Sequence, residues 1–510
     1  MQNPGGPFDA IVIGSGFGGC LAAQPLVDAG ARVLMLERGG WVERGAQNWG
    51  EEGAFVLTPH YTTDSEYKLR TRFGWRPQGL CSCVGGPSVF YGGASFRFRE
   101  RDFEVAPEVV GDSGAEWPLT YSDLEKHYDH VEELLGIAGE TGRDPTEPPR
   151  AGEYPQRPPP LAKTAHRIHD AASAIGLRPF RIPMAIHGGR CQSCTTCDAF
   201  ACAVEAKNDL ATVLLPRLVE KGLTLRPRTV VTRLDGTSGW IRAVEGMDAE
   251  TGERLRFEAP RVILAAGALA TPHLLFASGL DALSPAGDAV IGRYLMRHCN
   301  AMMYGYFRTP PNPDDEHHKQ VAIHDYYFGD PARPSLGKLG NIQQVMGPPR
   351  SLIRSLLPRP LGAAVGKLAG NLTGLLVIAE DQPRAGNRVE LDTGVRDRFG
   401  LPGARITHSY SRRDRLARRA LLRRAREILR QAGALFTATW NVNTFSHALG
   451  TARMGPDPRT SAVDDTCRFR GVENLWITDG SVLPTSAGVN PSLTIAANAH
   501  RVGALLAEQG

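Results

Sequence analysis

The first part of the chain alternates short apolar runs with a segment of small residues, a pattern typical of a βαβ unit. FDAIVIG (8–14) predicts a buried strand, GFGGCLAAQPLVDAG (16–30) a helix, and ARVLMLERG (31–39) a second strand that ends near an acidic residue. A polar, proline-rich stretch from about residue 99 to residue 187 does not continue this alternation, and its clearest helix is predicted over 116–139. The chain therefore begins as a doubly wound sheet that is interrupted by an insertion.

The alternation returns after residue 205. The pattern predicts a helix over 209–222, a strand over 223–234, a hairpin near 249–253 and an apolar strand over 261–268. Farther along, 387–394 predicts a strand. Residues 412–433 combine apolar positions at helical spacing with arginines between them, which favours a solvated amphipathic helix over a dedicated binding face.

Length and charge narrow the class of protein. A chain of 510 residues exceeds the size at which one hydrophobic core keeps growing, so two lobes are expected. With 58 basic and 54 acidic residues, the formal charge of +4 indicates no nucleic-acid partner. The sequence shows neither an export signal nor an apolar run of about 18 residues, so we expect a cytoplasmic protein without a transmembrane segment. The odd number of cysteines, nine, favours reduced thiols.

A dinucleotide fingerprint lies between the first strand and the first helix. Gly14, Gly16 and Gly19 form G-x-G-x-x-G, and Glu37 ends the next strand, where an acid is expected to accept ribose hydroxyls. The glycines permit a tight turn, approach of the backbone to a pyrophosphate and close packing of helix on strand. A glycine turn without a ligand is the alternative. The fingerprint itself does not distinguish a nicotinamide from a flavin cofactor.

Three further segments decide between these cofactors. CVGGPSVFYGGASFR (83–97), GALATPHLLFASG (267–279) and the C-terminal stretch from HALGTARMG through ITDGS to VNPSLTIAANAH (447–500) resemble signatures of the glucose–methanol–choline (GMC) oxidoreductases, FAD enzymes that act on alcohols. Pro87, Tyr91 and Asp281 depart from the usual signature residues. The resemblance implies an α/β fold in which a discontinuous Rossmann-like FAD-binding lobe (1–105, 205–298 and 445–510) carries an inserted α+β substrate-binding lobe (106–204 and 299–444).

The resemblance also implies site residues. His447 and Asn490 match the catalytic pair, in the His/Asn form of the cholesterol-oxidase and choline-oxidase type. The residues expected to bind FAD are Gly14, Gly16, Phe17, Gly18, Gly19, Glu37, Arg38, Gly85, Gly86, Ser88, Gly92, Gly93, Val231, Ala266, Gly267, Asp479, Gly480, Pro491 and Ser492.

The chemistry of alcohol oxidation fits this pair. A neutral His447 can accept the hydroxyl proton while the carbon delivers its hydride to the flavin N5, and Asn490 can hold the substrate oxygen by a hydrogen bond. A packed structural histidine is the alternative for His447. Asn490 followed by Pro491 is also typical of a helix N-cap followed by a first-turn proline. The N-terminus of that helix could stabilise reduced flavin. Glu380 and Asp381 could reach the substrate cavity, but a strand-end salt bridge is favoured. Residues 351–370 could form a lid over an apolar substrate, touch a membrane surface, or form a plain loop or short helix.

Four cysteines, Cys191, Cys194, Cys197 and Cys202, follow the spacing C-x2-C-x2-C-x4-C. Metal-free thiols or disulfides are favoured over an iron–sulfur cluster of the kind that some dehydrogenases of the resembled family carry, and over a zinc site. No metal is therefore expected.

The sequence thus predicts an FAD-dependent enzyme that oxidises a small-molecule alcohol, with oxygen or an unidentified compound as electron acceptor. The alternatives are a flavin-containing lyase that cleaves cyanohydrins, a dehydrogenase with an iron–sulfur cluster, and a non-catalytic FAD-binding protein. A sterol, sugar, polyol, long-chain alcohol or natural-product intermediate would each fit as substrate, and the sequence predicts no oligomeric state.

Overall fold

The structure is a computed structural model of the 510-residue chain. It describes residues 7–45, 48, 61–62, 66–194, 197, 200–237, 239–314, 319–347, 358, 360–366 and 368–509.

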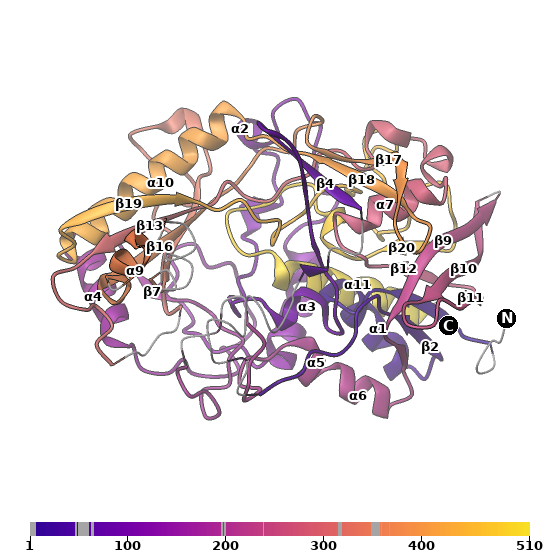
Figure 1. The fold of residues 1–510 in the computed structure, drawn as a ribbon, viewed down its shortest axis with the longest axis horizontal. Helices are drawn as coiled ribbons and strands as arrows, with labels where there is room; N and C mark the ends of the chain where they lie inside the picture. Colours follow the sequence, from indigo (N-terminus) through magenta and orange to yellow (C-terminus); the bar gives the residue numbers. More distant parts are fainter. Residues whose placement is uncertain are drawn as a thin grey trace.

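A parallel five-stranded sheet forms the first lobe (Figure 1). Its strand order is β20 (Leu475–Ile477), β12 (Val262–Leu264), β1 (Ala10–Ile13), β2 (Val33–Leu36) and β8 (Thr224–Arg226). β1 and β2 are buried at every position, as expected for parallel strands covered on both faces. The strands come from three distant parts of the sequence, as the discontinuous lobe predicts.

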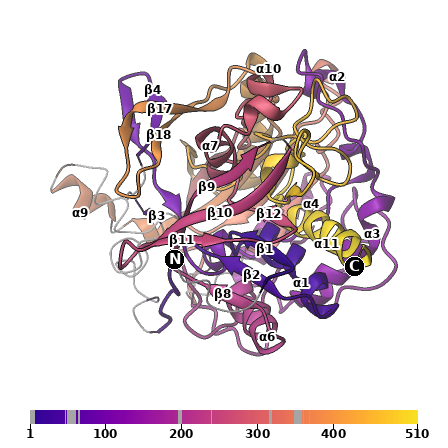
Figure 2. The ribbon, with the colours of Figure 1, turned by 90° about the vertical axis from the view of Figure 1, so that its right-hand side faces the viewer.

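Helices and a second sheet cover this parallel sheet on its two faces. Figure 2 shows α1 (Phe17–Asp28) beside α11 (Ser492–Glu508) on one side, and β9 (Thr229–Thr237), β10 (Trp240–Asp248) and β11 (Arg254–Phe257) on the other. Gly503 lets the two helices approach closely, because a Cβ atom there would lie 2.4 Å from the Ala22 carbonyl oxygen.

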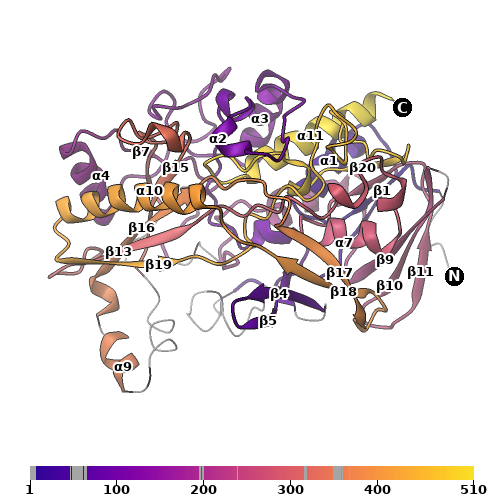
Figure 3. The same ribbon diagram turned by 90° about the horizontal axis from the view of Figure 1, so that it is seen from above.

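An antiparallel six-stranded sheet forms the second lobe. Its order is β19 (Phe436–Asn441), β13 (Ala301–Tyr306), β16 (Leu372–Ala379), β15 (Gly340–Val345), β14 (Val321–Ile323) and β7 (Phe180–Arg181). Figure 3 shows α10 (Arg412–Gln431) lying along this sheet, at the end of the molecule away from β9, β10 and β11. Apolar residues of α10 and of α4 (Lys163–Ala174) form one core with the face of the sheet that they cover.

A four-stranded sheet connects segments that the predicted domain boundaries place in different lobes. It contains β17 (Arg388–Arg396), β18 (Pro402–Thr407), β4 (Tyr67–Thr71) and β5 (Gly74–Pro77). β18 and β4 pair in parallel, so residues 67–77 of the expected FAD lobe join residues 388–407 of the expected substrate lobe. The boundaries themselves stay a prediction.

Most of the elements predicted from periodicity are present. The helix predicted over 412–433 is α10, which begins with a capping box between Ser411 and Asp414. The single helix predicted over 209–222 is wrong, because the chain forms two short helices there, and Pro216 lies in the first turn of the second. A proline lacks the amide hydrogen that a continuous helix would need at this position.

The remaining elements are short or peripheral. They are β3 (Tyr61–Thr62), β6 (Leu80–Cys81), α2 (Pro107–Val110), α3 (Ser122–Leu134), α5 (Leu210–Val213), α6 (Leu215–Glu220), α7 (Ala270–Ala277) and α9 (Leu361–Gly366). Within the described ranges, no helix has the length and apolar character that crossing a membrane requires.

Three histidines meet where α3 packs on α11. The Nδ1 atoms of His127 and His500 lie 2.8 Å apart, and the rings of His130 and His500 stack at 4.0 Å. Burial, together with the nearby Lys126, lowers the pKa of His127 to about 4, and burial together with His130 and His127 lowers that of His500 to about 3. The folded protein therefore keeps these rings neutral at a pH where the unfolded chain binds protons.

This cluster predicts loss of stability in mild acid. The unfolded histidines titrate near pH 6.5, so the folded state loses stability as the pH falls from about 6.5 towards 4. The variant His500→Gln should show a smaller drop in melting temperature between pH 7 and pH 5 than the unmodified protein. Thermal melts followed by circular dichroism measure this, with the exposed His166→Gln on α4 as control. Equal drops in all three proteins would contradict the assignment.

Candidate active site

The glycine turn between β1 and α1 leaves open room where a pyrophosphate is expected. Gly14 has a φ of +102°, and a Cβ atom there would lie 2.4 Å from the Ala265 carbonyl oxygen. By contrast, a Cβ atom at Gly16 would meet only the Pro87 side chain, 3.8 Å away. Gly16 is the N-cap of α1 and offers no side chain to the amide groups of the first turn. Open space and an uncapped helix N-terminus fit a phosphate group of FAD.

Glu37 anchors this turn from the end of β2. Its carboxylate accepts hydrogen bonds from the Ser15 amide at 3.0 Å, the Ser15 hydroxyl at 2.6 Å and the Gly39 amide at 2.9 Å. Burial raises the pKa of Glu37, and these hydrogen bonds act in the opposite direction. A contact between the Glu37 carboxylate and the ribose hydroxyls of FAD remains a prediction. Arg38 lies beside Asp397 and the Phe399 ring.

The loop at 83–97 lies directly against the turn. The Gly85 amide donates to the Ser15 hydroxyl at 3.0 Å, and a Cβ atom at Gly86 would lie 2.9 Å from Gly16 Cα. Ser88 donates its hydroxyl to the Gly85 carbonyl at 2.6 Å, which fixes the loop. The structure thus brings these sequence-predicted residues together.

Two of the residues that depart from the signatures of the resembled family, Pro87 and Tyr91, have defined places in this loop. Pro87 lies in the first turn of a 3-10 helix, Gly86–Val89. Tyr91 donates its hydroxyl to the Asn208 carbonyl at 2.6 Å and packs edge-on against Phe17 at 5.5 Å. Gly92 and Gly93 follow, and the Gly93 carbonyl accepts from the Ala185 amide at 2.8 Å.

Asp479 joins the second signature to the C-terminal segment. Its carboxylate accepts from the Thr271 hydroxyl at 2.5 Å, the Gly267 amide at 2.9 Å and the Ser481 amide at 2.8 Å. Burial raises the pKa of Asp479. The Gly480 carbonyl oxygen accepts a hydrogen bond from the Gly450 amide at 3.1 Å. This bond places the segment that follows His447 beside Asp479.

The other residues expected to bind FAD lie next to the glycine turn, Glu37 and Asp479. Gly18 packs on Thr478 and Asp479, and Gly19 packs on Gly14 and Val12. Val231 lies on β9, whose first residue, Thr229, donates its amide to the Glu37 carbonyl at 2.8 Å. Ala266 lies between β12 and Gly267, and Pro491 and Ser492 lie at the start of α11.

His447 lies between two polar side chains. Its Nε2 atom is 3.4 Å from the amide nitrogen of Asn490, and its Nδ1 atom is 2.9 Å from Nδ1 of His298. Gln343 donates from Nε2 to the Asn490 side-chain oxygen at 2.8 Å, so the Asn490 amide nitrogen faces His447. The expected catalytic pair is therefore brought together in space.

The contacts of His298 determine which nitrogen of His447 carries the proton. Nε2 of His298 lies 3.0 Å from the carbonyl oxygens of both Ser486 and Ala487, so Nε2 is the protonated donor. Neutral His298 then offers only a lone pair at Nδ1, and His447 must donate from its own Nδ1. Consequently Nε2 of His447, on the Asn490 side, carries a lone pair that can accept a proton.

Asp381 fixes the backbone that carries His298. Its carboxylate accepts from the amides of Arg297 and His298, each at 3.0 Å, and from the Ser486 hydroxyl at 2.9 Å. His298 has a φ of +60°, a strained conformation for a non-glycine residue. Sequence reasoning missed His298, because RHCN (297–300) belongs to none of the recognised motifs.

The predicted salt bridge at 380–381 is confirmed for Glu380, which lies 3.5 Å from Lys338 directly after β16. For Asp381 the interpretation is incomplete. Besides a contact with His408 at 3.7 Å, Asp381 accepts hydrogen bonds from backbone amides beside the candidate active site.

The surroundings keep both histidines neutral near pH 7. Burial lowers the pKa of His447 well below its usual value, and His298 and Lys319 lower it further, against an opposing effect of Asp381. Burial also lowers the pKa of His298. A neutral imidazole is the form that can accept a proton.

The N-cap interpretation of Asn490 is wrong. α11 begins at Ser492, and its N-cap position is Pro491. The Asn490 side chain instead contacts Gln343 and His447. Its amide is therefore engaged in the site and not in capping the helix.

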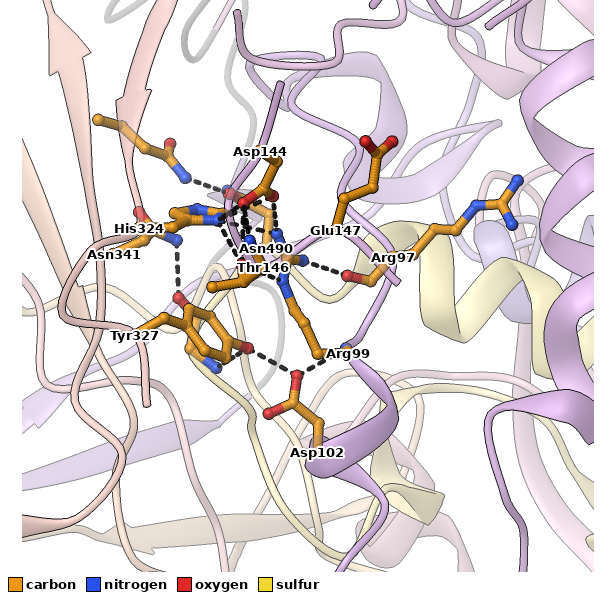
Figure 4. A network of polar contacts seen from close by, with 12 residues as sticks. Arg97, Arg99, Asp102, Asp144, Thr146, Glu147, His324, Tyr327, Asn341 and Asn490 are labelled. Carbon is orange, nitrogen blue, oxygen red and sulfur yellow. Dashed lines mark hydrogen bonds and ion pairs between the residues drawn. The ribbon is translucent and has the colours of Figure 1, made fainter. Parts of the chain in front are cut away.

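A buried polar network supports the loop that precedes Asn490 (Figure 4). Asn341 donates to the Gly488 carbonyl at 2.6 Å, and the Gly488 amide donates to the Tyr327 hydroxyl at 3.0 Å. Tyr327 in turn donates to Asp102 at 2.7 Å, and Lys338 lies 3.1 Å from the same carboxylate. The second lobe thus fixes the position of a loop of the first.

Behind Tyr327, the network continues through a buried ionic cluster that Figure 4 also shows. His324 Nδ1 lies 2.9 Å from Asp144, and Arg99 forms an ion pair with the same carboxylate. The pKa of Asp144 is lowered by His324 and Arg99, although burial acts against them. A carboxylate held in this way stays charged and fixes the loop around Thr146.

The cysteine segment is tied to the loop at 83–97 through Lys207, whose ammonium group donates to the carbonyl oxygens of Tyr91 at 2.8 Å and Cys197 at 2.9 Å. Cys191 has a raised pKa, caused first by burial, with Cys194 and Cys202 raising it further. In the part of the chain that the structure describes, no group of three or more His, Cys, Asp or Glu side chains is placed to hold a metal ion. The metal-free state stays a prediction. Of the candidate lid at 351–370, the structure describes residues 358, 360–366 and 368–370, which include the short helix α9, and the other residues lie outside the described ranges.

Comparisons with known proteins indicate the family to which the chain is similar. Family models described as GMC oxidoreductase match residues 8–300 and 383–499. The chain is 31% identical to 6'''-hydroxyparomomycin C oxidase of Streptomyces lividus, over 98% of this chain and 91% of that protein. It is 30% identical to paromamine 6'-oxidase of Streptomyces fradiae, over 97% and 90%. It is 27% identical to 2-methyl-1,2-propanediol dehydrogenase of Mycolicibacterium austroafricanum, over 97% and 94%.

Solved structures share the fold. Pyridoxine 4-oxidase from Mesorbium loti superposes with a TM-score of 0.67 at 20% identity, covering 98% of this chain and 99% of that one. Formate oxidase of Aspergillus oryzae gives 0.65 at 16% identity, covering 100% and 99%.

The open room beside Gly16 predicts a specific loss of cofactor. Gly16→Val should fold, because only Pro87 lies near the new side chain, yet it should lose FAD, because the side chain would occupy the place expected for the pyrophosphate. The FAD content per purified chain measures this, with circular dichroism as the test of folding. Gly152→Val, at an exposed glycine with no neighbour within 4 Å, is the matched control. A folded, fully yellow Gly16→Val protein would place the pyrophosphate elsewhere.

Proposed function

Because the chain belongs to the GMC oxidoreductase family, we propose that His447 is the base with which this FAD-dependent enzyme removes the hydroxyl proton of its alcohol substrate. Bound FAD supplies the acceptor for the hydride that leaves the alcohol carbon. The observation that carries the proposal is the pair of contacts at His447, whose Nδ1 atom lies 2.9 Å from Nδ1 of His298 while its Nε2 atom faces the Asn490 amide at 3.4 Å.

The two side chains have complementary tasks in this scheme. A hydroxyl group placed between them donates its proton to Nε2 of His447 and accepts a hydrogen bond from the Asn490 amide nitrogen. Gln343 holds the opposite end of the Asn490 amide, so the nitrogen cannot turn away without losing that bond. The pair therefore orients the oxygen and takes up the proton as the hydride departs.

His298 is a positioning residue in this proposal. Its Nδ1 atom accepts a hydrogen bond from the Nδ1–H group of His447 and so keeps the lone pair of His447 on the substrate side. When His447 becomes an imidazolium, the nearby charge of Asp381 stabilises it, against the opposing effects of burial, His298 and Lys319 on its pKa. Asp381 acts through the backbone amides that it holds.

For the substrate we propose a primary or secondary hydroxyl group of a small polyhydroxy compound. Two relatives are named as oxidases of paromomycin-type and paromamine compounds, and a third as a dehydrogenase of 2-methyl-1,2-propanediol. In that diol the tertiary carbon has no hydrogen, so a hydride can leave only from the primary alcohol. The electron acceptor is proposed to be oxygen or another small compound.

Anaerobic bleaching of the flavin tests the proposal. Polyhydroxy alcohols should bleach the bound flavin, and readmitted air should yield peroxide if oxygen is the acceptor. His447→Ala should keep FAD and slow the bleaching by about 10²-fold or more, because it removes a positioned base. Bleaching at the unmodified rate in this variant would exclude His447 as the base. Cleavage of cyanohydrins without any bleaching by alcohols would favour the lyase alternative.

His298 has its own test in the pH profile. The pKa of His447 is far below 6.5, so bleaching should be independent of pH from about 8 to 6 and fall only in stronger acid. His298→Leu removes a group that lowers this pKa, so the decline should begin at higher pH, with about 10-fold slower bleaching at pH 7. His298→Gln, which can still accept from His447, should restore much of the rate. A His298→Leu profile that matches the unmodified enzyme would contradict the positioning role.

A further inference from the structure

One face of the six-stranded sheet leads directly away from the candidate active site. Gln343, which holds Asn490, pairs with Leu376 on the next strand, Leu376 pairs with Met302, and Met302 pairs with Trp440. Directly paired residues of neighbouring strands point to the same face of a sheet. These four side chains therefore form one row that starts at the active-site amide and ends at a tryptophan on the edge strand.

The far end of this face is aromatic and exposed. Trp440 is 48% exposed and Phe436, on the same face of β19, is 59% exposed. Phe436 stacks on its cross-strand neighbour Tyr306 with ring centroids 4.7 Å apart. Tyr304 lies between these rows, with its ring against Gly374, where a Cβ atom would lie 2.8 Å from the ring. We call Met302, Tyr304, Tyr306, Phe436 and Trp440 the aromatic platform.

The opposite face of the same strands packs against a helix. Ala301, Met303, Leu375 and Val377 are buried in a core with α10. On the platform face, by contrast, Val345, Leu376 and Ile378 form a separate small apolar cluster with Met302 and Val442. Within this cluster Val345 and Ile378 are buried, whereas Leu376, 9% exposed, and the half-buried Met302 lie between the active-site end and the aromatic end.

The platform carries no formal charge of its own. None of the strands β13, β15, β16 and β19 contains Asp, Glu, Lys or Arg. Aromatic faces carry negative partial charge and attract the slightly positive C–H groups or the ammonium groups of a ligand. Saturated rings that present C–H groups on their faces and hydroxyl groups at their edges match such a surface.

The span of the row sets the size of the ligand. Three strand-to-strand steps of about 4.8 Å separate Gln343 from Trp440, a total of about 14 Å. A single six-membered ring with its reacting hydroxyl at Asn490 is too short to reach Trp440. A chain of linked rings covers the distance.

From the register, exposure and neutrality of this face, we infer that the platform binds the remote rings of a glycosidic substrate whose reacting hydroxyl lies between His447 and Asn490. The inference rests on the proposed function, which it narrows from polyhydroxy alcohols in general to compounds of linked sugar rings. Trp440 is then a residue that determines specificity without taking part in the chemistry.

Ligand affinity tests the inference independently of turnover. Isothermal titration of the FAD-loaded enzyme with methyl α-glucoside and with maltotriose compares one ring with three rings of the same sugar. We expect the trisaccharide to bind about 10-fold more tightly than the single ring. Trp440→Ala should abolish most of this difference and leave the affinity for the single ring unchanged, since one aromatic contact accounts for an effect of about this size.

Matched variants control the experiment. Trp240→Ala removes a tryptophan of similar exposure, 43%, from β10 in the other lobe and should keep the preference for three rings. FAD content and thermal melts show whether each variant is folded, and Phe436→Ala provides a second platform variant if Trp440→Ala is unstable.

The outcomes separate the two proposals. No preference for maltotriose in the unmodified enzyme, or an equal preference in Trp440→Ala, would overturn the platform. Dissociation of a dimer by Trp440→Ala in sedimentation velocity, without a change in sugar affinity, would identify this face as a contact between two copies and would also overturn it. Persistent preference for three rings in a protein whose flavin no alcohol bleaches would leave the platform supported and refute the proposed oxidation.

Discussion

The close contact of α1 with its surroundings is the constraint on which the other features depend. A Cβ atom at Gly18 would lie 2.7 Å from the Thr478 carbonyl oxygen, and one at Gly19 would lie 1.8 Å from the Gly14 carbonyl oxygen. Only glycine permits this approach, because any larger residue would push the helix off the sheet. The same contact places the turn at Gly14 to Gly16 beside the Asp479 segment, to which His447 is tied through Gly480.

The candidate active site depends on contacts between the lobes. His447 comes from the segment after the six-stranded sheet, Asn490 from the loop before α11, and Gln343 from β15. His298 and Ala487, which touch each other through the His298 ring, both have positive φ, +60° and +52°. Strain of this kind persists only where the surrounding structure fixes it, here through Asp381 and Ser486. The tautomer of His447 is thus a property of the whole assembly of loops.

The sequence predicted those parts of the molecule whose structure is determined by neighbouring residues along the chain. The βαβ unit, the glycine turn, α3, α10 and the His447 to Asn490 segment each lie in one continuous stretch with its own pattern or signature. His298 and Gln343 could not be found in this way, because their roles arise from strand register and from a loop that folds back across the sheet. The cap assigned to Asn490 failed for a related reason, since a distant strand competes with the helix for its side chain. Pro216 is visible in the sequence, and its missing amide hydrogen accounts for the break between α5 and α6.

Two parallel pairings have a consequence for the order in which the chain folds during synthesis. β12 can pair with β20 only after residues 475–477 have left the ribosome. In the same way, β4 can pair with β18 only after residues 404–406 have left it. Until then the growing chain exposes apolar strand edges that can pair with other chains. Such long-range pairings also form slowly, because a large loop must close before each contact is made. A nascent chain released early, without its last 40 or so residues, would therefore lack an outer strand of the parallel sheet and the helix α11 that packs on α1, and we expect it to aggregate or be degraded.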